Sequence, residues 1–260
     1  MECNTAAHAV KKEANLLMML GMDLEALQAS IESSEKNLAI KYNLRDIIKE
    51  RLENKTNPLF DKINIVSLGE NCEGRTIPAR YGIIKMRDEG RLSMPFDLAV
   101  HHGKSIIKIL ENNFDGYLDK ENLHFTYGKN DIWKCSLYPV SFNHDKDLTE
   151  NDKEKLIERY KKRIDNFINT VKNSKKTFYI YSIFCSDFKD FGRMKKLLNR
   201  YSDNCHLIVL NHRNILLDIK DPLITIIDSP FPSEEYNWHL PSCYLSDEGI
   251  AFERTNHFIN

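Results

Sequence analysis

The residues best suited to chemistry lie in the run Ser-Leu-Gly-Glu-Asn-Cys at residues 67–72. The apolar residues 63–68 predict a short buried strand that stops at Gly69. Glycine permits a tight turn, so a helix can begin near Cys72. The positive end of a helix dipole lowers the pKa of a thiol placed there and favours the reactive thiolate. Cys72 is therefore a candidate nucleophile, and the alternative is a small buried apolar residue.

A thiolate nucleophile also needs a proton acceptor and a group that stabilises an oxyanion. Asn71 precedes Cys72 and can donate its side-chain amide to an oxyanion. His144 follows an extended segment and is the favoured general base, provided that this segment runs parallel to the first strand. Asp97 or Asp145 would orient the imidazole, or Asp97 would merely cap a turn.

Other histidines remain open as the base. If the segment before His144 runs antiparallel, we expect the base to come from the C-terminal tail instead. The tail candidates are His239 and His257. His101 and His102 follow the Met-Pro-Phe-Asp turn, and His212 and His239 are weaker candidates.

Patterns that bind metals or nucleotide cofactors are missing from the sequence. His101 and His102 are adjacent, so their rings diverge, and there is no His-x-x-x-His pair. No Walker loop and no Gly-x-Gly-x-x-Gly run is present. The six cysteines are scattered without a Cys-x-x-Cys pair, which favours reduced thiols. We therefore expect no cofactor and no metal site.

The surrounding elements predict an α/β fold with a mainly parallel sheet in a three-layer α/β/α arrangement. A long amphipathic helix follows Thr149, and a second helix is expected at 188–201. Continuous apolar strands are typical of parallel sheets that are covered on both faces. They are expected at 178–184, 206–210 and 223–227, and residues 123–127 and 132–142 are also expected to be extended. In such sheets, functional residues gather at the carboxyl ends of the strands.

The N-terminal segment is predicted to be a separate helical extension. Residues 1–57 carry loose apolar stripes at helical spacing, and 58–260 form the α/β domain that holds the candidate catalytic residues. Exposed stripes favour association, so we expect them to pack on the α/β domain or on a second copy in a homodimer. The tail at 233–260 shows no period that assigns an element.

Composition excludes several classes of protein. The 260 residues are 42% hydrophobic and 29% charged, which is typical of a globular chain. The formal net charge of −1 gives no pull toward nucleic acid or an anionic membrane. No apolar run is long enough to span a bilayer and no signal peptide is evident, so we expect a cytoplasmic protein. Its substrate, whether a small molecule, a glycan or a peptide, is not specified.

Four elements in order resemble the bacterial family DUF1796, a domain of unknown function described as papain-like cysteine peptidases. They are residues 65–72, the Met-Pro-Phe-Asp-Leu run at 94–98, the Phe-Asp-Gly-Tyr-Leu run at 114–118 and the Phe-Asn-His-Asp run at 142–145. The match covers roughly residues 64–183, and Leu98 stands where the family usually has tryptophan. The resemblance implies a cysteine peptidase, often encoded near surface-polysaccharide genes.

Two alternatives stay open. A nucleophile at the end of the first strand of a parallel sheet is similar to the Ser-Gly-Asn-His hydrolases and acyltransferases, with Cys72 in the serine position. The chain would then be a transferase or esterase of surface-polysaccharide modification. The non-enzyme alternative is a binding module with a helical docking segment, in which Cys72 is structural.

Overall fold

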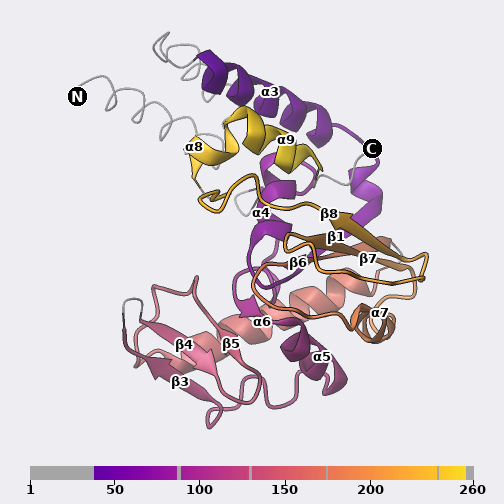
Figure 1. The fold of residues 1–260 in the computed structure, drawn as a ribbon. Helices are drawn as coiled ribbons and strands as arrows, with labels where there is room; N and C mark the ends of the chain where they lie inside the picture. The colour runs from indigo at the N-terminus through magenta and orange to yellow at the C-terminus, as the bar shows by residue number, and fades with distance from the viewer. Residues whose placement is uncertain (1–37, 87–88, 129–130, 174, 239, 256–260) are drawn as a thin grey trace. The chain divides into compact units, whose positions relative to one another are not determined.

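The computed structural model describes residues 38–255 apart from 87–88, 129–130, 174 and 239 (Figure 1). The chain divides into two compact units. One consists of Lys62–Arg75 and Leu92–Pro230, and the other of Met1–Asp61, Thr76–Arg91 and Phe231–Asn260. This differs from the predicted division into 1–57 and 58–260, because two later segments group with the N-terminal residues.

The first unit is built on a four-stranded parallel sheet, here called sheet A. Its strands are β1 (Ile63–Gly69), β6 (Lys176–Ile183), β7 (Cys205–Asn211) and β8 (Ile224–Asp228), and they lie side by side in that order (Figure 1). The order follows the chain without reversal. The predicted α/β class with a parallel sheet is confirmed.

One face of sheet A carries the helices that connect its strands. The helices of this unit are α5 (Gly103–Glu111), α6 (Lys153–Val171) and α7 (Phe191–Leu198). Phe167 of α6 packs on Tyr179, and Phe191 of α7 packs on Tyr181, with ring centroids 6.4 and 5.5 Å apart. Tyr179 and Tyr181 alternate along β6, so both point to this face. Right-handed crossovers between strands in sequential order explain why α6 and α7 lie on the same side.

The opposite face of sheet A meets the start of α4 (Glu73–Arg80), which begins in this unit. A Cβ added at Gly74 would lie 3.0 Å from Ser67 Oγ and 3.1 Å from a methyl carbon of Ile180. Ser67 and Ile180 are paired in register, so they share this face. Glycine thus suits a position where the start of α4 lies close to the strands, and this first turn of α4 covers part of the second face of sheet A.

A second, antiparallel sheet, sheet B, is inserted in the chain between β1 and β6. Its order is β2 (Val100–His101), β5 (Val140–Ser141), β4 (Ile132–Cys135) and β3 (Leu123–Thr126) (Figure 1). The segments 123–127 and 132–142 were expected to be extended, and they contain β3, β4 and β5. A turn between β4 and β5 breaks the second segment, and the antiparallel sheet itself was not predicted.

The other unit contains α3 (Leu38–Lys55), α8 (Pro241–Tyr244) and α9 (Asp247–Thr255), and the short 3-10 helix η2 (Phe60–Lys62) lies at the boundary of the two units. Ile47 and Ile48 of α3 are buried, and Asn43 donates to Leu245 O and to Asp247 Oδ1, both at 2.9 Å. The apolar face of α3 is therefore covered by the tail that the sequence left unassigned. The rest of the predicted N-terminal helices lies outside the described residues. Within the described part of the chain, no helix is long and apolar enough to cross a membrane.

Candidate active site

The turn after β1 places Cys72 directly before α4. A Cβ added at Gly69 would overlap the carbonyl oxygen of Asn71, so the backbone can fold back this tightly only with glycine. The side chain of Asn71 then accepts a hydrogen bond from Glu73 N at 3.1 Å, which satisfies one free N–H at the helix start. The predicted sequence of strand, turn and helix is found.

Cys72 and His144 lie together. Cys72 Sγ is 3.3 Å from His144 Nε2, which is hydrogen-bonding distance for sulfur. Cys72 is only 7% exposed, whereas His144 is exposed to solvent. The rival tail histidines, His239 and His257, lie outside the described residues.

The route to this pairing is not the expected one. We expected the segment before His144 to join the first strand in a parallel sheet. It forms β5 instead, which is antiparallel to β2 and β4 in sheet B. His144 follows the end of that strand, so sheet B delivers the imidazole to the carboxyl end of β1.

The environment of His144 keeps its imidazole neutral. Desolvation lowers the pKa of His144 from its usual 6.5, Arg75 adds to the lowering, and the nearby carboxylate of Asp145 only partly opposes both. At neutral pH the ring therefore retains a lone pair. In the tautomer with its proton on Nδ1, Nε2 can accept the thiol proton of Cys72.

Asp145 fixes the chain beside His144. Its carboxylate accepts hydrogen bonds from Arg159 at 2.7 Å, from Tyr160 OH at 2.8 Å, and from Arg163 at 3.1 and 3.2 Å. Both carboxylate oxygens thus accept hydrogen bonds from α6, and Asp145 is buried. These contacts anchor the segment after β5 on α6, and the orienting role of Asp145 stays a prediction.

Asp97 is fully buried in the Met-Pro-Phe-Asp turn. Its Oδ2 accepts a hydrogen bond from Met94 N at 2.9 Å and lies 3.9 Å from Arg75 Nε. These contacts hold the Met-Pro-Phe-Asp turn closed and fix the side chain of Arg75, which lies in the first turn of α4. The orienting role of Asp97 stays a prediction.

Asn71 has a donor in reserve. Its Oδ1 caps α4, while its Nδ2 is buried and has no hydrogen-bond partner among the described residues. Asn143 Oδ1, next to His144, is likewise buried without a partner in the described part of the chain. A buried polar atom that lacks a partner costs about 1–3 kcal/mol, so a ligand that pairs with it is stabilised.

Glu70 is a buried carboxylate in the turn after β1, and no sequence pattern singled it out. Its Oε1 accepts the Tyr181 hydroxyl at 2.7 Å, and its Oε2 accepts the backbone N–H groups of Phe184, Cys185 and Ser186 at 2.7–3.0 Å. Burial alone would raise the pKa of Glu70, but these hydrogen bonds outweigh it and lower the pKa. Glu70 thus ties the end of β6 to the turn after β1.

A second buried pair joins α4 to β7. His212 Nε2 is 2.8 Å from Glu73 Oε2, and its Nδ1 donates to Ser229 O at 2.6 Å. Burial would lower the pKa of His212, but the charge of Glu73 and the two hydrogen bonds outweigh it and raise the pKa. His212 was a weak candidate base, and the structure gives it this anchoring role beside Cys72.

His101 is a buried structural residue. Its Nδ1 donates to Ala99 O at 3.0 Å, and its Nε2 is 2.9 Å from Tyr117 OH. Desolvation lowers the pKa of His101 to about 3, so the ring stays neutral within the core. A histidine on a two-residue strand gives no sequence pattern that predicts this burial.

The described site thus combines a thiol, a neutral imidazole and a buried amide donor at the carboxyl end of β1. These are the groups required for nucleophilic attack on a carbonyl carbon. No protein-family model, no curated protein and no solved structure matches the chain.

Proposed function

We propose that the chain is a cysteine-dependent hydrolase or acyl-transfer enzyme with Cys72 as nucleophile and His144 as general base. The supporting observation is the 3.3 Å separation of Cys72 Sγ and His144 Nε2, two groups 72 positions apart in the sequence. A cysteine that served only to fill space would need no imidazole beside it.

The reaction follows from the geometry. His144 Nε2 takes the thiol proton, and the sulfur attacks a carbonyl carbon to give a tetrahedral oxyanion. Asn71 Nδ2 donates a hydrogen bond to that oxyanion. The imidazolium then returns the proton to the leaving group, and a thioester to Cys72 remains. Water, or a hydroxyl or amine acceptor, attacks the thioester with His144 again as base, and the free thiol is restored.

The choice between the two enzyme classes rests on topology. Papain-like peptidases place the cysteine on a helix and the histidine on an antiparallel strand. Here Cys72 precedes α4, and His144 follows β5 of the antiparallel sheet B. The cysteine also follows β1 of a parallel sheet, as the nucleophile does in Ser-Gly-Asn-His enzymes. We propose the papain-like class, and with it the resemblance to DUF1796, and the support is that the proposed base follows a strand of an antiparallel sheet.

The proposed setting is cytoplasmic, and the proposed substrate is an acyl or peptidyl compound, including one formed in surface-polysaccharide assembly. The first experiment therefore uses small reporters instead of a natural substrate. The intact protein is incubated with p-nitrophenyl acetate and with an acetyl thioester, and acyl-enzyme formation is followed by intact mass and peptide mapping.

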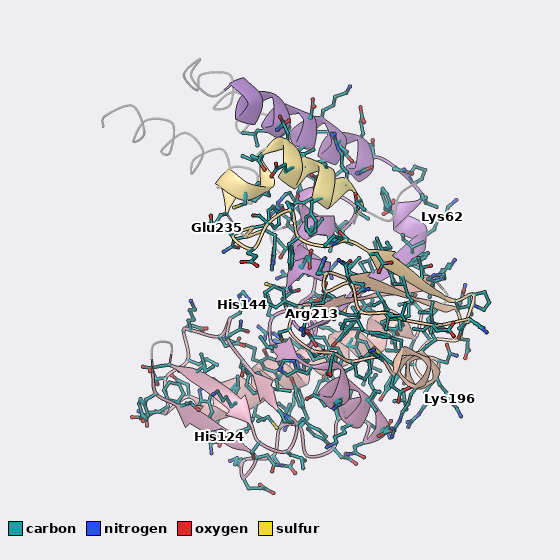
Figure 2. All side chains as sticks on the ribbon, in the orientation of Figure 1. Lys62, His124, His144, Lys196, Arg213 and Glu235 are labelled. Atoms are coloured by element: carbon teal, nitrogen blue, oxygen red, sulfur yellow. The ribbon has the colours of Figure 1, made fainter. Side chains whose placement is uncertain are left out.

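We expect a stoichiometric acetyl adduct on Cys72. His144→Ala should slow its formation by roughly 100- to 10,000-fold, the usual contribution of a general base. Asn71→Ala should slow it by roughly 100- to 1,000-fold, as loss of one oxyanion donor does. The control is His124→Ala, an exposed histidine of β3, which should react at the parental rate (Figure 2).

Two results would refute the proposal. One is an adduct rate that His144→Ala leaves unchanged. The other is equal labelling of Cys72 and Cys185, because Cys185 is exposed but its pKa is raised by burial and Glu70, so an activated Cys72 should be labelled much faster. Either result would leave the binding module, with a structural Cys72, as the better account.

A further inference from the structure

A second cluster of reactive side chains lies at the same edge of sheet A. It consists of Glu70 after β1, His102 before α5 and Cys185 after β6. His102 Nδ1 is 3.6 Å from Glu70 Oε1 and 3.7 Å from Cys185 Sγ. All three potential ligand atoms lie within 4.8 Å of one another. Three different donor atoms therefore converge on one point.

The contact between His102 and Cys185 is a weak sulfur hydrogen bond, with His102 Nδ1 3.7 Å from Cys185 Sγ. At 3.6 Å, the nitrogen of His102 is too far from the Glu70 oxygen for a good hydrogen bond. Tetrahedral zinc has Zn–N near 2.0 Å and Zn–S near 2.3 Å, which places neighbouring ligand atoms about 3.3–3.5 Å apart. The observed separations of 3.6 and 3.7 Å are close to that spacing. Two of the three donor pairs thus lie near the spacing that a metal ion requires, and the third pair lies within 4.8 Å.

We propose that Glu70, His102 and Cys185 form a binding site for one divalent transition-metal ion of the zinc class, with a fourth position open to water or a ligand.

The donor set selects the class of metal. A thiolate and an imidazole favour Zn²⁺, Co²⁺ or Fe²⁺, whereas Mg²⁺ and Ca²⁺ prefer oxygen ligands throughout. Three protein ligands with an open fourth position are typical of zinc sites that act on a substrate. His102 is 42% exposed and Cys185 is exposed, so an ion and a further ligand can reach the site from solvent.

The oxygen ligand is fixed before any ion arrives. The three backbone N–H groups bind Glu70 Oε2, whereas Oε1 accepts the Tyr181 hydroxyl at 2.7 Å. Oε1 therefore keeps a lone pair, and this is the oxygen that faces His102. Such hydrogen bonds to a ligating carboxylate set its orientation and raise metal affinity.

The other two ligands are also positioned by their surroundings. Arg213 donates to the carbonyl oxygens of Cys185 at 2.9 Å and Ser186 at 3.3 Å, which holds the loop after β6 (Figure 2). A Cβ at Gly103, the residue after His102, would overlap the ring of Phe188. The start of α5 therefore packs directly on the β6–α7 loop, and this packing sets the distance between His102 and Cys185.

The charges of the ligands also favour the binding of a divalent ion. When an ion binds, the Cys185 thiol loses its proton to solvent and coordinates as a thiolate. A divalent ion neutralises the two negative charges that Glu70 and Cys185 would then carry side by side.

The test uses the intact protein, freed of metal with a chelator and then titrated with Co²⁺. We expect one equivalent to bind, with a thiolate-to-cobalt charge-transfer band and the intense visible bands of four-coordinate cobalt. Zn²⁺ should displace the cobalt and bleach both. Cys185→Ser should abolish the charge-transfer band, and His102→Gln should weaken cobalt binding by at least 10-fold, as loss of one ligand does.

Matched controls separate this site from others. Cys243→Ser and His124→Gln change a cysteine and a histidine outside the cluster and should bind cobalt like the parent. Cys72→Ala should also leave the charge-transfer band intact. A band that disappears in Cys72→Ala and persists in Cys185→Ser would assign the ion to the Cys72–His144 pair and overturn the proposal. So would the absence of any thiolate band in a parent protein whose circular dichroism shows it to be folded.

Discussion

Replacing Asp145 with alanine is expected to lower the free energy of unfolding by about 3–5 kcal/mol. The side chain is buried, and it accepts hydrogen bonds from two arginines and Tyr160. Arg163 is 8% exposed, so the substitution leaves its guanidinium buried without the carboxylate. Arg159 contributes little to the cost, because its side chain is 30% exposed and it keeps a two-pronged contact with Asp147.

Urea unfolding followed by circular dichroism and fluorescence gives the energy, and two further variants locate its source. Asp145→Ala combined with Arg163→Met removes both charges from the buried site. The double variant should be more stable than Asp145→Ala alone, because no unpaired buried charge remains. Asp145→Asn should fall between the parent and Asp145→Ala, since it keeps one acceptor oxygen.

The same variant carries a functional readout. Asp145 is adjacent to His144 and anchors its backbone on α6, so its loss should loosen the pairing with Cys72. Iodoacetamide labelling of Cys72 in folded Asp145→Ala is expected to slow toward the rate of His144→Ala. The reasoning is wrong if Asp145→Ala costs less than about 1 kcal/mol, the level of a surface ion pair. It is also wrong if the double variant is the less stable of the two.

Three more predictions concern the same edge of sheet A. The rate of acyl transfer to Cys72 should be maintained at pH 6.5 and should fall only as the pH drops through the lowered pKa of His144, because protonation removes the base. A rate profile measured from about pH 5 to 8 would contradict this if its midpoint lay above 6.5. Gly69→Ala should lower the free energy of unfolding by at least about 2 kcal/mol, because the added Cβ would overlap backbone that cannot move aside. Gly192 in α7 has open space around it, so Gly192→Ala should raise that free energy by about 0.5–1 kcal/mol, measured by thermal unfolding. His212 has a raised pKa in the folded state, so it contributes its full stabilisation below its unfolded pKa of about 6.5 and loses it as the pH rises through the folded pKa. His212→Asn should therefore flatten this part of a profile of unfolding free energy measured from about pH 6 to 9. An unchanged slope would count against the pair with Glu73.

The features that could be predicted from the sequence are local ones. The strand before Gly69 and the helix after Cys72 follow from an apolar run, a glycine and a capping asparagine within ten residues. The parallel strands β6, β7 and β8 follow from continuous apolar runs, because burial on both faces leaves no polar alternation.

The features that could not be predicted depend on long-range pairing. β2 and β5 have two residues each, too few for any periodic pattern, and yet they carry His101 and lead to His144. Glu70 and Cys185 are 115 positions apart, and His102 and Cys185 are 83 apart, so no spacing rule joins them. Arg80 and Glu253 form a buried pair that was also not predicted. The reason is that charged residues in a sequence usually indicate a solvated surface.

The insertion of sheet B between β1 and β6 has a consequence for how the molecule forms. Asn64 and Thr177 are neighbours in the finished sheet, yet 113 residues separate them. At about 5–20 residues per second, a ribosome takes roughly 6–20 seconds to supply the partner strand after β1 has been made. During that time β1 has no parallel strand to pair with, and the backbone N–H groups that later donate hydrogen bonds to Glu70 have not yet been made. Cys72, the proposed nucleophile, is therefore synthesised early, but the environment that positions it is completed only after β6 has been translated.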